Sequence, residues 1–382
     1  MILNSSRPVL LLLLTIMPMA LAIESRAAEG FEPLFNGEDL AGWVKEGKAG
    51  FVVRDGELRC NGSGNYPSWL RTEKTYENFV LRLEYKLSHY GDSGVFLHAP
   101  KYGRNSNVGF EVQLSANTRN KKPVDSSNMA IFAAVAPKKL AGLVGKWNQV
   151  EIVSDWPKLK VTLNDEVMQD LDVSENQELK YRFRSGYIGL QDRGKGTSFR
   201  NIEIKTLAST DTGWKPMFNG KNLDGWTNNK KNGAKWEVDN GDLVMRDGHG
   251  YLISDGTYRN FHFQTYLRAS EFANGGIFLR WKSLVPFDRG VEIQIEDIAD
   301  SIDPTGSIYS YVRAKRLPIV PGEWYPMQIF LEDRHCVVRV NGVTVAETDE
   351  FPIDRIGHVT LQMHRHHSWV RFNDMKIKSL DK

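Results

Sequence analysis

The sequence predicts an all-β protein that consists of two tandem antiparallel β-sandwiches. The chain has 382 residues, which is more than one ordinary domain needs and enough for two. One ordered set of short motifs occurs twice along it. Between the motifs, short runs of alternating apolar and polar residues are separated by turn sequences, which is typical of a sandwich of two antiparallel sheets.

The repeat begins with the pattern Phe-Asn-Gly-x-x-Leu-x-Gly-Trp, which occupies residues 35–43 and again 218–226. Further pairs follow in the same order: Gly94–Leu97 with Gly276–Leu279, Phe110–Leu114 with Val291–Ile295, Gly145–Trp147 with Gly322–Trp324, and Leu190–Gln191 with Leu361–Gln362. The repeat is far longer than the units of a solenoid, so it indicates a duplicated domain. We expect a first sandwich over residues 29–207, a small polar linker over 208–213 and a second sandwich over 214–382.

Local patterns within each copy favour strands and hairpins. In the stretch 81–87, apolar residues alternate with charged ones, so every second side chain is expected to face the core. The pairs Asp55-Gly56, Asn240-Gly241 and Asn341-Gly342 supply the residues that tight β-turns require. No long window shows a helical period.

The first 28 residues are predicted to be a secretory signal peptide. Arg7 precedes an apolar run from Val9 to Ala22, and Ala20-Leu21-Ala22 fits a cleavage site with small residues. A membrane anchor is the alternative, but the run is shorter than the roughly 20 apolar residues that span a bilayer. The sequence therefore predicts export, either to a periplasm or as a secreted protein.

Charge and cysteine content exclude several classes of partner and scaffold. The formal net charge is only +2 and no block of Lys or Arg stands out, so nucleic acids and anionic membranes are not expected as partners. Cys60 and Cys336, the two cysteines, lie in different copies and do not make a disulfide framework.

A Glu-x-Gln strand in each copy is the first candidate for a functional site. Its apolar residues face one way, and its carboxylate and amide share the other face. The polar members are Glu292, Gln294 and Glu296 in the second copy, and Glu111 and Gln113 in the first. Such a row can bind sugar hydroxyls or hold a general acid or base. An ordinary solvent-facing row is the alternative, but its recurrence in both copies favours a site.

Two further segments could complete that site. Phe278 and Arg280 are expected on one face of a strand, as a sugar platform with a cation for an oxyanion, and Phe96 and His98 are their counterparts. A cross-strand Arg–Glu pair is the alternative role for Arg280. Near the end of each copy come Gln191 and Arg193, and Gln362 and His364. A divalent metal at His364 and Glu292 is possible, although no ligand spacing demands it and solvated histidines are favoured.

Taken together, these motifs resemble the 3-keto-disaccharide hydrolase domain, once in each half of the mature chain. The resemblance implies the concanavalin A-like lectin/glucanase fold, an antiparallel jelly-roll sandwich. The second copy matches the family pattern at Arg280, Glu292, Gln294, Gln362, His364 and at Tyr309 within Thr-Gly-Ser-Ile-Tyr. The first copy has His98, Phe132 and Arg193 where the family has Arg, Tyr and His, which puts its catalytic competence in doubt.

The resemblance implies a carbohydrate partner and hydrolysis of 3-keto-glycosides, or the related elimination and hydration. In this interpretation Glu292 is the base, Arg280 the oxyanion partner and His364 the acid or a metal ligand. Substrate contacts are expected from Gln294, Phe278, Tyr309, Gln362, Glu296, Glu111, Gln113, His98 and Arg193. An ordinary glycosidase would instead pair Glu292 with Glu296, about 6.5–7 Å apart on one strand. A non-catalytic, lectin-like glycan-binding protein and a chain whose first copy binds while its second reacts are further alternatives.

Overall fold

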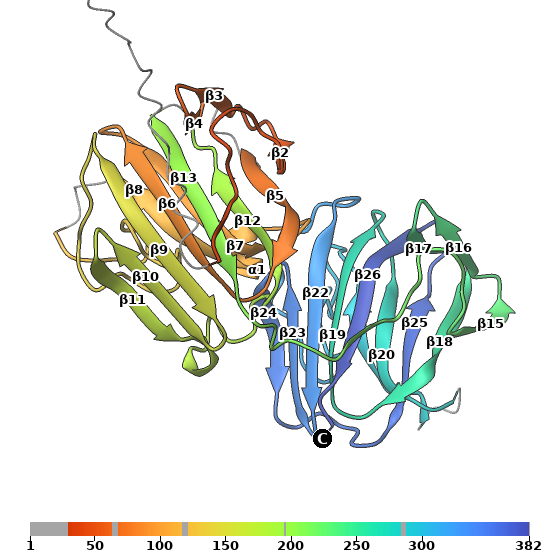
Figure 1. The fold of residues 1–382 in the computed structure, drawn as a ribbon. Helices are drawn as coiled ribbons and strands as arrows, with labels where there is room; N and C mark the ends of the chain where they lie inside the picture. The colour runs from red at the N-terminus through yellow and green to blue at the C-terminus, as the bar shows by residue number, and fades with distance from the viewer. Residues whose placement is uncertain (1–29, 63–67, 117–120, 195, 284–287, 382) are drawn as a thin grey trace, which may run out of the picture.

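The computed structural model describes residues 30–62, 68–116, 121–194, 196–283 and 288–381. The predicted signal peptide, residues 1–28, lies outside the described residues. Figure 1 shows two β-rich halves joined by a short connection, and each half consists of one larger and one smaller antiparallel sheet. Among the described residues, no helix is long and apolar enough to cross a membrane.

In the described part of the N-terminal half there are thirteen strands. The larger sheet has the order β11-β10-β9-β6-β13-β4-β3 with β1 paired to β13, and the smaller sheet has the order β2-β5-β12-β7-β8. The elements are β1 (Glu32–Pro33), β2 (Trp43–Gly47), β3 (Val52–Arg54), β4 (Glu57–Arg59), β5 (Ser68–Tyr76), β6 (Phe79–Leu87), β7 (Asp92–Ala99), α1 (Asn105–Val108), β8 (Phe110–Ser115), β9 (Trp147–Asp155), β10 (Lys158–Leu163), β11 (Glu166–Asp172), β12 (Gly186–Gln191) and β13 (Thr197–Thr206).

The C-terminal half repeats this arrangement. Its larger sheet has the order β16-β17-β26-β19-β22-β23-β24 with β14 paired to β26, and its smaller sheet has the order β15-β18-β25-β20-β21. The strands are β14 (Trp214–Pro216), β15 (Trp226–Asn232), β16 (Lys235–Asp239), β17 (Asp242–Arg246), β18 (His249–Tyr258), β19 (Phe261–Ala269), β20 (Gly275–Trp281), β21 (Val291–Ile295), β22 (Tyr325–Glu332), β23 (His335–Val340), β24 (Val343–Thr348), β25 (Gly357–Met363) and β26 (Trp369–Ser379). The predicted fold class is confirmed.

Each half has its own apolar core between its two sheets. The expected alternation holds on β6, where Leu81, Leu83, Tyr85 and Leu87 are all buried. Asn341 and Gly342 both have positive φ, +49° and +79°, and join β23 to β24 as the turn sequence predicted. Residues 207–213 form no strand between β13 and β14.

The middle of each smaller sheet is covered on both faces. Every residue of β20 is buried, and so is all of β7 except Asp92. On the side away from the main core, a small apolar cluster covers these strands: Trp69, Phe96 and Ala99 in the N-terminal half, and Tyr251, Phe278 and Trp281 in the C-terminal half. This second apolar layer is the floor on which the candidate site is built.

Candidate functional site

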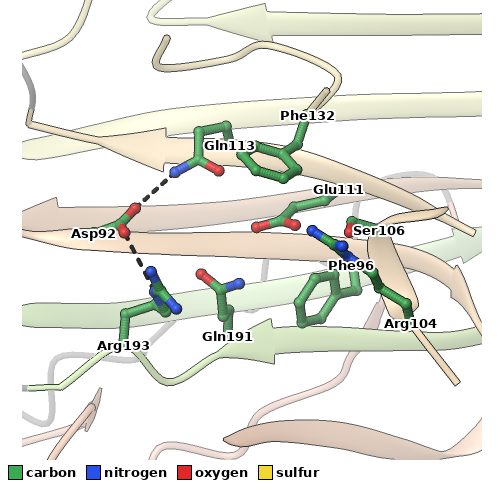
Figure 2. A pocket seen from close by; sticks show the side chains of 9 residues that line it. All are labelled: Asp92, Phe96, Arg104, Ser106, Glu111, Gln113, Phe132, Gln191 and Arg193. Atoms are coloured by element: carbon green, nitrogen blue, oxygen red, sulfur yellow. Dashed lines mark hydrogen bonds and ion pairs between the residues drawn. The ribbon is translucent and has the colours of Figure 1, made fainter. Parts of the chain in front are cut away.

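A cleft of about 330 Å³ lies over the smaller sheet of the N-terminal half (Figure 2). Strands β7, β8 and β12, which are neighbours in the sheet, supply most of its wall. It is lined by Asp92, Phe96, Arg104, Ser106, Glu111, Gln113, Phe132, Gln191 and Arg193. Carboxyl, amide and guanidinium groups thus converge beside two phenyl rings in one hollow, as is typical of small-molecule sites.

Glu111 is the buried carboxyl of this cleft, with 3% of its surface exposed. Burial raises its pKa to about 8, and the charge of Asp92 adds to the rise. The charges of Arg193 and Arg104 oppose it, as does a hydrogen bond from Gln191. A carboxyl with this pKa is mostly protonated at pH 7 and half protonated near pH 8. Both forms are therefore populated at mildly alkaline pH, so the group can donate or accept a proton.

A polar network fixes the groups next to Glu111. The side-chain nitrogen of Gln113 donates to Asp92 Oδ1 at 2.7 Å, and Arg193 Nε donates to Asp92 Oδ2 at 3.4 Å (Figure 2). Asp92 therefore links strand β8 to the segment after β12. These contacts orient an amide and a cation at the mouth of the cleft.

Aromatic side chains form the apolar part of the wall. Phe96 packs edge-to-face on Trp69, with ring centroids 5.6 Å apart. Phe132 lies on the other side of Glu111 (Figure 2), and its backbone N–H donates to the carbonyl of Glu111 at 2.9 Å. An apolar ring surface next to amides and a carboxyl matches the alternating apolar and hydroxyl faces of a sugar.

The C-terminal half repeats the arrangement around Glu292. Glu292 pairs with Phe278 across β21 and β20, and Gly276 pairs with both Gln294 and Gln362. Burial raises the pKa of Glu292 to about 8. The positive charge of Arg289 lowers this pKa, and the negative charge of Glu296 raises it further. Within the described part of the chain, its buried Oε1 has no hydrogen-bond partner.

The floors of the two halves differ in the residues that form them. Trp281 stands in β20 where the N-terminal half has Ala99 in β7, since these residues occupy matching places in the register. The indole packs on Tyr251 and Phe278, with ring centroids 4.8 and 5.1 Å apart. In the N-terminal half, Ala99 is fully buried in a cluster with Trp69 and Phe96, and Tyr187 packs against that cluster.

The roles predicted for Arg280 and His98 are wrong. Both residues have positive φ, +54° and +51°, at irregularities in the pairing of β20 and β7. The extra residue reverses the alternation, so both side chains leave the face that Phe278 occupies. Arg280 is fully buried and donates to the carbonyls of Arg259 and Ile353.

His98 is held in the same way on the core side of its sheet. Its Nε2 bonds to the carbonyl oxygen of Glu77 at 2.7 Å, and its ring packs between Phe79 and Phe110. Neither Arg280 nor His98 lies where it could contact a sugar in the groove.

The other predicted residues of the second copy lie around the same face. His364 is exposed, with its ring 4.6 Å from that of His249. Glu296 accepts a hydrogen bond from Asn274 at 2.7 Å, and Tyr309, 46% exposed, donates its backbone N–H to the carbonyl of Glu292. In the part of the chain that the structure describes, no group of three or more His, Cys, Asp or Glu residues is arranged to hold a metal.

Sequence reasoning missed Asp92, Arg104 and Ser106, which all line the cleft. Asp92 is the first residue of β7 and lies two residues before Gly94, where the repeated motif Gly94–Leu97 begins. Arg104 and Ser106 lie in and beside α1, in a segment that carries no repeated motif. No signal in one sequence could have found them.

Comparison with known proteins agrees with the duplicated fold. The family model described as a 3-keto-alpha-glucoside-1,2-lyase-like domain matches residues 30–205 and 213–378. A 3-keto-disaccharide hydrolase of Bacteroides thetaiotaomicron is 24% identical over 230 residues, covering 47% of this chain and 79% of that protein.

Similar solved structures each cover a little less than half of the chain. A candidate glycosyl hydrolase from Parabacteroides distasonis has 25% identity and a TM-score of 0.42, covering 48% of this chain and 97% of its own. The carbohydrate-binding module CBM66 of Bacillus subtilis has 14% identity and a TM-score of 0.33, covering 43% and 96%. The resemblance drawn from the motifs is confirmed by the family match: the chain belongs to the family of 3-keto-alpha-glucoside-1,2-lyase-like domains, whose model it matches twice.

Proposed function

We propose that the protein is an exported carbohydrate-active hydrolase that cleaves glycosides, in particular 3-keto-glycosides, with Glu111 as its acid–base group. One observation carries the proposal: a buried carboxyl whose pKa is about 8 faces a cleft of sugar-compatible size and lining. General acid–base catalysis is most effective when the pKa of the group lies near the working pH. Family membership and the name of the Bacteroides relative support the substrate class.

The proposed reaction uses the acidity that a 3-keto group gives to the proton on C2. Glu111 as carboxylate takes this proton, and the resulting enolate oxygen is stabilised by the Arg104 cation. When the enolate collapses, the C3 carbonyl reforms, the C1–C2 double bond forms and the C1–O bond breaks. The departing oxygen takes the proton back from Glu111. Addition of water across the double bond places OH on C1 and a proton on C2, so the sum is hydrolysis.

The alternative is a lectin-like protein that binds glycans without cleaving them. The sequence-based prediction that Glu292 carries the reaction is a second alternative, because its carboxyl has the same raised pKa. We favour the N-terminal half because the cleft of about 330 Å³ lies over its smaller sheet and is lined by Glu111, Arg104 and Arg193.

A matched pair of variants separates these possibilities. The mature protein is incubated with 3-keto-disaccharides and the corresponding unoxidised sugars, and release of the sugar from C1 is measured. We expect turnover of the keto forms, a loss of about 100-fold or more in Glu111→Gln, and little change in Glu292→Gln. A loss confined to Glu292→Gln would move the reaction to the C-terminal half.

Binding and localisation complete the test. Sugar affinity that persists in Glu111→Gln supports a catalytic residue, whereas binding without any turnover of the wild type would identify a glycan-binding protein. Export is tested by fractionating cells that produce the full chain. A precursor retained in the cytoplasm with residues 1–28 intact would contradict it.

A further inference from the structure

The two halves use one hairpin asparagine differently. In the N-terminal half, Asn164 in the β10–β11 turn accepts a hydrogen bond from the backbone N–H of Gln149 at 2.9 Å. In the C-terminal half, Asn341 occupies the same place in the β23–β24 turn, and Pro326 replaces Gln149. The backbone bonds match, because Asn164 N–H donates to Gln149 O and Asn341 N–H donates to Pro326 O, both at 2.9 Å. Proline has no N–H, so the Asn341 oxygen lacks this internal partner.

Asn341 instead bonds to the other half of the molecule. Its Oδ1 accepts a hydrogen bond from the backbone N–H of Arg104 at 2.8 Å. The approach is close: a Cβ on Gly103 would lie 2.5 Å from Asn341 Oδ1 and 2.7 Å from Pro326 Cδ. Gly103 also has φ of +96°. A glycine is therefore required there both by the close approach of Asn341 and by the backbone conformation.

The residues just before Arg104 rest on the same surface. The backbone N–H of Lys101 donates to the hydroxyl of Tyr266 at 3.0 Å. Tyr102 stacks on Trp324, with ring centroids 5.5 Å apart and planes 16° apart. The segment that leads into α1 is thus held by β19, β22 and the β23–β24 turn, and Figure 1 shows α1 where the two halves meet.

The connection between the halves makes contacts with both of them. Asp211 lies 3.5 Å from Arg184 of the N-terminal half and 2.8 Å from Lys378 of the C-terminal half. Its carboxylate also accepts a hydrogen bond from the indole N–H of Trp214 at 2.8 Å. Asp211 thus links the two halves through charged contacts, in addition to the contacts of residues 101–104.

Arg104 extends from this support into the cleft, toward Glu111 (Figure 2). The charged groups that face Glu111 are Asp92 on β7, Arg193 after β12 and Arg104 before α1. Asp92 and Arg193 pair with each other at 3.4 Å, and both belong to the N-terminal half. Arg104 alone among these three is placed by a contact from the other half.

We propose that the C-terminal half acts as a scaffold for the N-terminal cleft, and that Asn341 is a positioning residue that holds Arg104 over Glu111. The consequence for turnover rests on the proposed function; the contact itself does not. The duplicated sandwich would then supply one cleft and the surface that completes it.

The test compares Asn341→Gly with Asn164→Gly. The two asparagines have φ of +49° and +47°, so glycine adopts either conformation without strain, and each variant removes one amide. In Asn341→Gly we expect amide hydrogen exchange over residues 101–108 to accelerate about tenfold, the strength of one lost hydrogen bond. We also expect kcat/KM to fall about tenfold and its inflection to move to higher pH, because the Arg104 charge lowers the pKa of Glu111.

The control and rescue variants make the interpretation specific. Asn164→Gly should change neither the exchange of residues 101–108 nor the pH profile, and Asn341→Asp, which keeps the acceptor oxygen, should restore slow exchange. In an Arg104→Gln background, Asn341→Gly should have no further effect on kcat/KM, since its only route to the cleft is removed.

Each outcome decides one of the two proposals. Wild-type exchange and pH profile in Asn341→Gly would overturn the positioning role while leaving the proposed function intact. Accelerated exchange in a protein whose wild type cleaves no sugar would uphold the contact and refute the proposed function.

Discussion

A glycine beside each buried glutamate determines where its carboxyl lies. A Cβ on Gly94 would clash with the Oε1 of Glu111 and lie 2.9 Å from its Cγ. Gly276 stands in the same relation to Glu292. The missing side chain lets each carboxyl fold over the neighbouring strand, which buries it and raises its pKa to about 8. Strand glycines often mark such close approaches.

We predict that Gly94→Ala lowers kcat/KM about 100-fold without unfolding the protein. The backbone of Gly94 is not among the positive-φ residues, so alanine fits the strand and the clash falls on the Glu111 side chain alone. A displacement of about 1 Å at a reacting group costs a factor of this size.

Steady-state kinetics and thermal unfolding of the variant check this prediction. In a Glu111→Gln background the same change should have no additional effect on turnover, because the group it displaces is already inactive. Equal losses in both backgrounds would show that the alanine acts on the fold and not on the carboxyl.

At the scale of elements, a bulge decides which side chains reach the groove. The pairing of β20 with β25 shifts between Phe278 and Trp281, and that of β12 with β7 shifts between Tyr187 and Gly189. The irregularity occurs at matching places in both halves, which indicates a feature of the fold rather than an accident of one copy. Because of the bulge, the side chain of Trp281 lies on the groove face, where simple alternation would place that of Arg280.

We predict that Arg280→Met lowers the free energy of unfolding by roughly 2–4 kcal/mol and leaves kcat/KM unchanged. The guanidinium supplies hydrogen bonds to two carbonyls, of Arg259 and Ile353, and its removal leaves them unpaired in the interior. Denaturant unfolding and turnover of the variant are the measurements.

Arg246→Met is the matched control. Arg246 makes an ion pair with Glu237 in which both side chains remain more than a third exposed, 38% and 45%, so its loss should change stability by no more than about 0.5 kcal/mol. A loss of turnover in Arg280→Met at unchanged stability would restore the oxyanion role that simple alternation predicted.

Most of the strands could be predicted because their signals are local. Alternation placed Leu81 and Tyr85 in the core, and Asn-Gly pairs marked real turns. Alternation also put Glu111 beside Gln113 in one cleft. It failed at His98 and Arg280, because a bulge has no simple mark in a single sequence and one extra residue reverses the faces.

At the scale of the molecule, duplication has produced two similar frameworks with different surfaces. The order of motifs revealed the duplication, because each copy can be compared with the other. The junction between the halves could not be found in this way, since Arg104 and Asn341 do not occupy matching places in the repeat and meet only in the assembled molecule. Sequence alone favoured the second copy as the reacting one, whereas the cleft described above lies over the smaller sheet of the first.

The buried carboxyls and histidines of both halves together determine how stability depends on pH. The pKa values of Glu111 and Glu292 rise to about 8 in the fold from 4.5, so the folded state binds these protons more tightly than the unfolded chain. Their contribution is complete below pH 4.5 and is lost as the pH rises to 8. Burial lowers the pKa of His98 to about 4 and of His262 to about 3. Their contribution is present above pH 6.5 and is lost as the pH falls.

Between pH 6.5 and 8, therefore, the two carboxyls dominate the pH dependence of stability, because the opposing effect of the two histidines is at most half of its full slope at pH 6.5 and disappears as the pH rises. We predict that the free energy of unfolding of the wild type falls across this window by up to about 1.4 kcal/mol per pH unit for each carboxyl, and that the Tm falls with it. Glu111→Gln, which is neutral at every pH, should remove about half of the fall, and the double variant with Glu292→Gln most of it. Thermal unfolding at pH 6.5, 7.25 and 8 measures the slopes. Parallel curves for all three proteins would mean that the carboxyls are ionised in the fold, and the acid–base role of Glu111 would then lose its physical basis.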